Sequence, residues 1–119
     1  MHIEGFVIPV PDAKKQAYLE MAEWFDAAMM ELGALQIVEA WEKDVPDGKR
    51  TDFRKAVQAE AGEKVVFSWI VWPDKQTAEA AHERIHEDEK FKALTDVPFD
   101  GRRMIFGSFE PLLSLGNGA

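Results

Sequence analysis

The segment KVVFSWIVW at positions 64–72 constrains the fold more than any other part of the chain. Its valine, phenylalanine, tryptophan and isoleucine residues favour β-strands. Side chains of a strand point alternately to opposite faces of the sheet. One alternating set is Val65, Phe67, Trp69 and Val71, and the other is Val66, Ser68, Ile70 and Trp72. Because both sets are largely apolar, the segment predicts a strand that is covered on both faces.

Two segments with helical spacing lie on either side of this strand. The first runs from Ala13 to Leu32, and its apolar residues recur at steps of three and four. That stripe is Ala17, Met21, Trp24, Phe25, Ala28 and Leu32. Asp12 is expected to cap its start and Gly33 its end. The second helix is expected to begin after its N-cap, Asp74, with a narrow stripe formed by Ala78, Ala81 and Ile85.

Three further strands complete the pattern. They are expected in EGFVIPV, which Pro9 and Pro11 should end, in ALQIVEAWEKD, and in RRMIFGSFEPLL. The polar segment 49–63 predicts a loop with room for a short helical turn, and 91–101 predicts an irregular passage with another. The order β-α-β-β-α-β predicts a ferredoxin-like α+β fold, a four-stranded antiparallel sheet with both helices on one face.

The other sheet face raises the question of what covers it. The central strand is apolar on both faces, and we expect Trp41 and Phe106 to add large groups to the exposed face. A monomer rarely exposes so large an apolar surface. We therefore predict a homodimer packed sheet to sheet, a dimeric α+β barrel. One domain over residues 1–113 and a flexible tail over 114–119 are expected.

Composition limits the partners and the location. The net charge of −8, from 22 acidic and 14 basic residues, disfavours nucleic-acid binding, which depends on lysine and arginine. With no cysteine there are no disulfides, which fits a reducing compartment. The chain has no apolar run of about 18 residues and no signal-peptide pattern at its start. We expect a cytoplasmic protein with no membrane or nucleic-acid partner.

Four blocks, GFVIPVP, VPDGKRTDFRKAV, EKVVFSWIVWPD and PFDGRRMIFGSFEPLL, together resemble the YbaA-like family of small bacterial proteins. Their order and spacing cover almost the whole chain. The family is a domain of unknown function within the dimeric α+β-barrel group, so the resemblance implies the same fold and a dimer. It supplies no catalytic residue. Because the wider group includes cofactor-independent monooxygenases, haem-handling enzymes and stress-response proteins, the fold does not choose among functions.

A metal-site motif stands in the second helix. His82-Glu83-Arg84-Ile85-His86 reads H-E-x-x-H, the spacing of zinc metalloproteases, and Glu110 could supply a third ligand. A chain of 119 residues offers little room for a peptidase cleft, and the family resemblance covers the chain without a metal. We therefore expect no metal site, with His82 half-buried beside the apolar stripe and His86 solvated.

Three residues are candidates for binding a small molecule. Trp24 and His82 are expected to face a cleft between helices and sheet, and a histidine near neutral pH suits proton transfer. Arg102 belongs to one of two basic groups, which could hold a carboxylate or phosphate if they met in space. The first group is Lys49-Arg50 with Arg54-Lys55, and the second is Arg102-Arg103. The alternative is ordinary solvated loop charge. Ser68 has no nucleophile motif around it.

Two functions follow from these residues. The first is a homodimeric protein that binds a small apolar or aromatic molecule in the cleft between helices and sheet. The alternative is a cofactor-independent enzyme, monooxygenase-like or isomerase-like, that acts on a small hydrophobic substrate with His82 as the weak catalytic candidate. Neither reading requires a cofactor.

Overall fold

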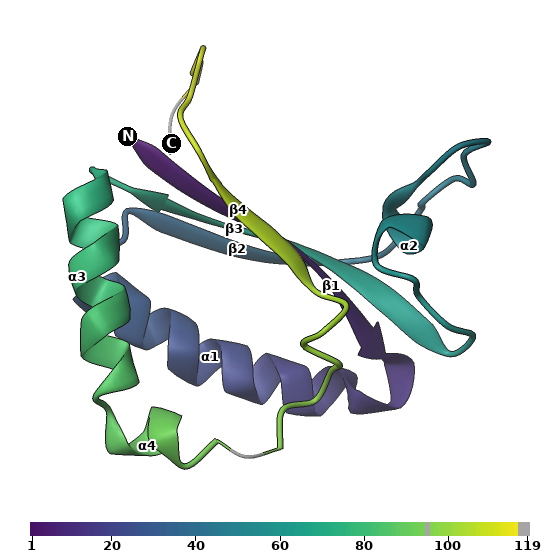
Figure 1. Ribbon diagram of the computed structural model, residues 1–119, viewed down its shortest axis with the longest axis horizontal. Helices are drawn as coiled ribbons and strands as arrows, with labels where there is room; N and C mark the ends of the chain where they lie inside the picture. Colours follow the sequence, from purple (N-terminus) through teal and green to yellow (C-terminus); the bar gives the residue numbers. More distant parts are fainter. Residues whose placement is uncertain (95, 117–119) are drawn as a thin grey trace.

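A computed structural model describes residues 1–94 and 96–116 as a four-stranded sheet with helices (Figure 1). Two long helices and two single-turn helices accompany the strands. In chain order the elements are β1 (His2–Pro11), the 3-10 turn η1 (Asp12–Lys14), α1 (Lys15–Glu31), β2 (Gln36–Trp41), α2 (Phe53–Ala56), β3 (Glu63–Trp72), α3 (Lys75–His86), α4 (Glu89–Lys92) and β4 (Ile105–Phe109). The helical turn expected in segment 49–63 is α2. The turn expected in segment 91–101 begins earlier than predicted, because α4 starts at Glu89 and only Phe91 and Lys92 lie within that segment.

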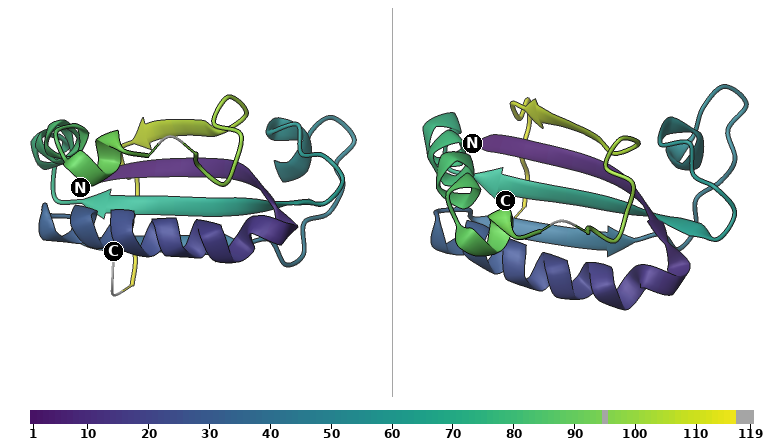
Figure 2. Two further views of the ribbon diagram at one scale, coloured as in Figure 1. Left: turned by 90° about the horizontal axis from the view of Figure 1, so that it is seen from below. Right: turned by 60° about the horizontal axis from the view of Figure 1, so that its bottom comes forward.

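The sheet is antiparallel throughout, and its strands lie in the order β2-β3-β1-β4. Both long helices, α1 and α3, lie on one of its faces (Figures 1 and 2). This is the predicted ferredoxin-like arrangement. The strand KVVFSWIVW lies inside the sheet, where β3 pairs with β1 over its full length and with β2 on its other side.

The first strand is longer than the sequence predicts. Pro9 does not end β1, which continues to Pro11 while pairing with β3. Pairing with β4 covers only Ile3 to Val7, so the last part of β1 has a neighbour on one side alone. A proline lacks the N–H group of a ladder hydrogen bond and is tolerated where a strand has such a free edge.

The start of α1 also differs from the prediction. Asp12 begins the 3-10 turn instead of capping the helix, and α1 starts at Lys15 without a side-chain cap. The buried stripe is Tyr18, Ala22 and Met29, whereas Ala17 is exposed. Near the N-terminus of α1, the face that packs on the sheet is therefore shifted by one residue from the predicted stripe. In α3, by contrast, Asp74 accepts a hydrogen bond from the Thr77 amide at 2.7 Å, as a capping residue does.

The helix-facing side of the sheet carries the core. Ile70, 2% exposed, packs with buried residues of α1 and α3, and Val66 packs with Tyr18 and Ala22. Trp41 pairs with Val66 and Phe106 pairs with Phe6, so both aromatic residues lie on this side. The expectation that they enlarge the open face is wrong, because the register of β2 and β4 was not fixed by their sequences.

The open face is nonetheless apolar. Phe67 is 43% exposed, and its ring packs edge-on against Trp69 with centroids 5.4 Å apart. Phe53 of α2 contacts Phe67 at one end of this face. Further along, Phe109 is 62% exposed, and its ring lies near Gly5 and Gly107. The two alternating sets of β3 therefore have different surroundings, one beneath the helices and one on the open face.

An ion-pair cluster holds the long loop before β3. Arg103 binds both carboxylate oxygens of Glu63 at 2.7 Å, and Arg54 donates to the Glu63 carbonyl oxygen and to Glu42. Arg54 of the first basic group and Arg103 of the second thus meet at Glu63, as the anion-site hypothesis required. Their guanidinium groups are already engaged by acceptors of the chain itself, so this pair is neither an open anion site nor solvated loop charge.

The C-terminal residues follow the last strand, β4. Residues 114–116 form no helix or strand, and positions 117–119 of the predicted flexible tail lie outside the described residues. The division into a domain over 1–113 and a tail stays a prediction. In the part of the chain that the structure describes, no helix has the length and apolar character needed to cross a bilayer.

The core position of Ile70 gives a stability prediction. Ile70→Asp should unfold the chain, because an unpaired buried charge costs several kcal/mol against a total stability of roughly 5–15 kcal/mol. Ile70→Val, the matched control, should lose only about 1 kcal/mol. Circular dichroism and urea unfolding measure both. A folded Ile70→Asp protein of wild-type stability would contradict the placement of this face beneath the helices.

Candidate functional site

Polar side chains interrupt the apolar face of three neighbouring strands. In β1, Glu4 stands in the same alternating set as Phe6 and Ile8. In β2 and β3, Glu39 lies directly opposite Ser68. Glu4 and Ser68 are both buried. A carboxylate or hydroxyl at a core-facing position is uncommon and requires hydrogen-bond partners.

The helix above them carries a matching exception. Tyr18 and Ala22 define the buried face of α1, and Asp26 follows Ala22 by four residues. Residues four apart lie on one face of a helix, so the Asp26 carboxyl points toward the sheet. Sequence reasoning missed Asp26, Glu39 and Glu4 because it followed apolar residues only. The available signal was an acidic residue in phase with an apolar stripe.

These groups surround a cavity of about 350 Å³ between the helices and the sheet. It lies between the two packed parts of the core, touching Ile70 on one side and Ile8 on the other. Most of its wall is apolar or aromatic. The lining residues are Phe6, Ile8, Tyr18, Met21, Ala22, Phe25, Asp26, Glu39, Ser68, Ile70, His82, Phe91, Leu94, Val97, Phe99 and Met104.

A hydrogen-bonded carboxyl pair forms the most polar part of this wall. The Tyr18 hydroxyl donates to Glu39 Oε1 at 2.7 Å, and the Asp26 carboxyl shares a hydrogen bond with Glu39. Burial raises the pKa of Asp26 to about 9, with the hydrogen bond and the charge of Glu39 adding to the effect. At neutral pH Asp26 is therefore a carboxylic acid. Burial and Glu39 also raise the pKa of Tyr18, which stays a neutral donor.

A third acidic residue, Glu4, is paired with the predicted histidine. Glu4 accepts the Trp72 indole N–H at 2.7 Å through Oε1, and its Oε2 lies 2.7 Å from His82 Nε2. Burial would raise the pKa of Glu4, but the hydrogen bonds of His82 and Trp72 outweigh it and the pKa is lowered. The hydrogen bond to Glu4 raises the pKa of His82 despite partial burial. This pair is an ionic clamp between β1 and α3.

A surface hollow adjoins the cavity at the carboxyl pair. It has a volume of about 390 Å³ and lies where the start of α1 meets β2. Tyr18, Ala22 and Glu39 line both spaces and so form the wall between them. On the outer side, the Lys15 ammonium lies over the Trp41 ring, 5.1 Å from its centroid. The Tyr18–Glu39 hydrogen bond is thus reachable from two directions.

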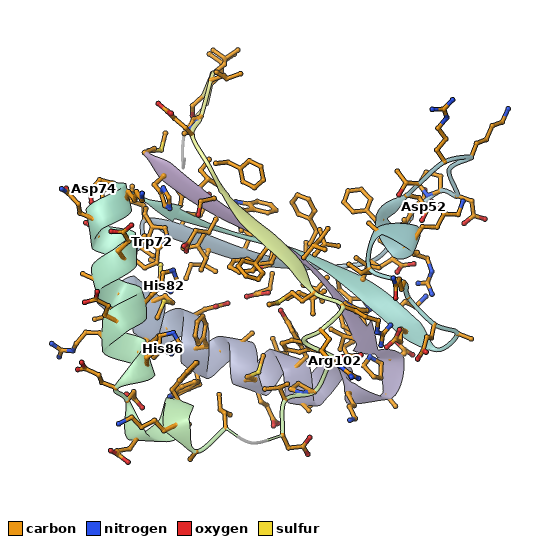
Figure 3. The ribbon with its side chains drawn as sticks, viewed as in Figure 1. Asp52, Trp72, Asp74, His82, His86 and Arg102 are labelled. Atoms are coloured by element: carbon orange, nitrogen blue, oxygen red, sulfur yellow. The ribbon has the colours of Figure 1, made fainter. Side chains whose placement is uncertain are left out.

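The structure brings only one of the three predicted binding residues to the cavity. His82 extends from α3 into the space between the helices and the sheet (Figure 3) and lines the cavity. Trp24 packs beside the core under the Lys90 ammonium and is not among the lining residues. Arg102 stands in a turn, its side chain 92% exposed and bonded to Asp100. Binding roles for Trp24 and Arg102 remain predictions without support from the cavity.

The H-E-x-x-H residues do not converge on a common point. His82 is half-buried and bonded to Glu4, whereas His86 is exposed and its ring packs edge-on against Phe91. Among the described residues, no group of three or more histidine, aspartate or glutamate side chains is arranged to hold a metal ion. The half-buried and solvated environments expected for the two histidines are those observed.

Fold and interior together define a class, a small ferredoxin-like α+β protein with a polar pair inside an apolar cavity. Two solved structures share this fold. A dimeric ferredoxin-like protein from an uncultured marine organism superposes with a TM-score of 0.65 at 8% identity, covering 98% of this chain and 100% of that one. An uncharacterized NIPSNAP domain protein from Burkholderia xenovorans gives 0.57 at 15% identity with the same coverage. Identities this low support the fold alone.

Sequence comparison defines the family. The model of a protein family of unknown function, DUF1428, matches residues 1–101. The uncharacterized protein YbaA of Escherichia coli strain K12 is 50% identical over 113 residues, covering 94% of this chain and 97% of YbaA. YbaA of Shigella flexneri matches equally well. The chain therefore belongs to the DUF1428 family, and the predicted YbaA-like resemblance is confirmed.

The carboxyl pair predicts a pH dependence of stability. Folded Asp26 keeps its proton up to a pKa of about 9, whereas in the unfolded chain it titrates near the ordinary value of 3.8. Between these values the folded state binds more protons, so the free energy of unfolding falls as pH rises. Asp26→Asn, which mimics the protonated acid, should make this fall shallower by up to about 1.4 kcal/mol per pH unit.

Urea unfolding from mildly acid to mildly alkaline pH measures the slope. Every other titrating group, including the Glu4–His82 pair, is common to wild type and variant, so their difference isolates Asp26. Glu23→Gln, an exposed change on the same helix, serves as control and should keep the wild-type slope. Equal slopes for wild type and Asp26→Asn would show that Asp26 is ionised in the folded protein.

Proposed function

We propose that this protein holds a small, neutral, apolar or aromatic molecule in the cavity between its helices and sheet. The observation that carries the proposal is the cavity itself, about 350 Å³ with a wall that is mainly apolar and aromatic. Binding sites for small molecules have this character, with a few polar groups that fix orientation. Tyr18, Asp26, Glu39 and Ser68 supply those groups here.

Charge narrows the ligand class. Two acidic side chains, Asp26 and Glu39, line the wall, and the chain as a whole carries a net charge of −8. An anionic ligand would meet like charge in a poorly solvated space, which costs several kcal/mol. A neutral molecule avoids this cost and can accept a hydrogen bond from the protonated Asp26. This favours neutral ring compounds that carry an oxygen acceptor.

A pair of probes tests ligand class. β-Tetralone, a neutral bicyclic ketone, should shift amide signals of α1 and β3 in heteronuclear NMR spectra, whereas β-naphthoate, a carboxylate of similar size, should bind at least tenfold more weakly. Ala22→Phe should fill the cavity and abolish the shifts, and Ala27→Phe, on the exposed side of α1, should not. If Ala22→Phe fails to fold, Val97→Trp fills the cavity from the opposite wall.

Equal binding of ketone and carboxylate would contradict the neutral-ligand proposal. Shifts that persist in both cavity-filling variants would place the binding site elsewhere. The absence of any binding by either probe at millimolar concentration would count against a ligand site of this class.

We further propose that two copies associate through their open sheet faces to form a dimeric α+β barrel. Phe67, Trp69 and Phe109 lie on that face, and neither long helix covers it. A contiguous apolar face of this kind is characteristic of a subunit interface. The marine ferredoxin-like relative is described as dimeric, which supports the same assembly here. Burial of both faces of β3 then has an explanation.

Phe67→Asp tests this assembly. The variant should dissociate to monomers while keeping helix content, because the new charge meets the partner and not the core. Gln76→Asp, an equal change on the outer side of α3, should stay dimeric. Sedimentation and light scattering at micromolar concentration report the mass. A monomeric wild-type protein, or a fully dimeric Phe67→Asp protein, would contradict the sheet-packed dimer. The cytoplasmic location expected from the sequence stays a prediction.

The alternative function, a cofactor-independent enzyme, is favoured by one observation. Two carboxyl groups line the cavity wall, and the pKa of one of them, Asp26, is strongly raised; groups with such perturbed pKa values gather at catalytic sites. His82, the catalytic candidate from the sequence, is less suited, because its Nε2 is held by Glu4.

A further inference from the structure

We propose that the Asp26–Glu39 pair catalyses enolisation of a neutral carbonyl compound bound in the cavity. This inference rests on the ligand site proposed above and adds a reaction to it. Both carboxyl groups line the cavity, and they share a hydrogen bond. Tyr18 fixes Glu39 through its 2.7 Å hydrogen bond, and Ser68 lies opposite Glu39 in the sheet. The surrounding wall is apolar and strengthens hydrogen bonds within it.

A single proton on the pair lets one carboxyl group act as the general acid and the other as the general base. Both carboxyl groups line the same cavity wall, and burial, with the hydrogen bond and charge of Glu39, raises the pKa of Asp26 so that it favours the acid form. An acid and a base at one site, each near its working protonation state, are what general acid–base catalysis needs.

The proton transfers balance without a cofactor. When substrate binds, its carbonyl oxygen replaces Glu39 as the acceptor of the Asp26 O–H, and the freed Glu39 removes a proton from the adjacent carbon. The C–H electron pair forms the C=C bond, while the C=O π pair takes the Asp26 proton, giving an enol. Asp26 is now the carboxylate and Glu39 the acid, so the pair still holds one proton. Return of a proton to the same carbon, or to a conjugated one, regenerates the starting pair.

The other titratable groups around the pair have different roles. The pKa of Tyr18 is raised by burial and by Glu39, so its hydroxyl remains a positioning donor. His82 faces the cavity from α3, but its Nε2 is engaged by Glu4 Oε2 at 2.7 Å. Ser68 is the only polar group that β3 presents to the cavity, and between Phe91 and Met104 the described lining residues are all apolar.

Cavity size and lining define the substrate class. The volume of about 350 Å³ accommodates one or two fused rings. The aromatic wall favours flat apolar compounds, and the protonated Asp26 favours a carbonyl oxygen. A C–H bond next to that carbonyl is the reacting bond. The class is therefore a neutral, hydrophobic ketone or conjugated enone with a proton on the adjacent carbon.

Hydrogen–deuterium exchange tests the reaction directly. β-Tetralone in D₂O should exchange the hydrogens beside its carbonyl faster with wild-type protein than in buffer, as followed by NMR. Asp26→Asn and Glu39→Gln should each lower the exchange rate by about 100-fold or more, the contribution typical of general acid–base catalysis. Both variants should bind β-tetralone within a few-fold of wild type. Glu20→Gln, an exposed change on α1, should leave binding and exchange unchanged.

Separate binding and exchange measurements distinguish the two proposals. Binding without exchange above the buffer rate would overturn the enolisation proposal and leave the ligand site intact. Exchange that persists in both carboxyl variants would also overturn it. Absence of binding would remove both proposals. If Asp26→Asn is unfolded by circular dichroism, Glu39→Gln decides the outcome. The wild-type rate should fall as pH rises through the Asp26 pKa of about 9, which a purely structural carboxyl pair would not produce.

Discussion

Both faces of β3 are apolar and have to be shielded from water, and the arrangement of the other elements follows from this constraint. β3 runs inside the sheet, with Ile70 beneath the helices and Phe67 on the opposite side. Two amphipathic helices cover the first side, and a second copy is the proposed cover of the other. The cavity follows from the same arrangement. Where α1, α3 and the segment before β4 meet over one curved sheet face, the side chains leave about 350 Å³ unfilled.

The polar groups of the interior form two sets, which differ in their surroundings and in their roles. Glu4 is engaged on both oxygens by Trp72 and His82, which ties β1, β3 and α3 together. Removing one partner of such a buried pair leaves an uncompensated charge, so this clamp is structural. Asp26 and Glu39 are different, because they border the cavity and the pKa of Asp26 is raised by burial and by Glu39. A group that borders a cavity can act on what enters it.

Local patterns in the sequence predicted much of this fold and little of the site. The strand β3 and the cap residue Asp74 were predicted correctly, because each depends only on residues that are neighbours in the sequence. Among the site residues His82 alone was anticipated. Asp26 and Glu39 lie thirteen positions apart in the sequence, on different elements, and no local pattern links them. Their meeting depends on how α1 packs on β2.

By itself, the sequence determined the ferredoxin-like order of elements, the doubly apolar central strand and membership in the DUF1428 family. These are properties of periodicity and of residue type, which act over a few neighbouring positions. Tertiary structure alone decided the register, and with it that Trp41 and Phe106 face the helices and Phe67 the open side. A shift of one residue reverses the faces of a strand without changing its composition. The carboxyl pair also depends on tertiary structure. Burial and proximity set the pKa of Asp26, and both exist only once the chain has folded.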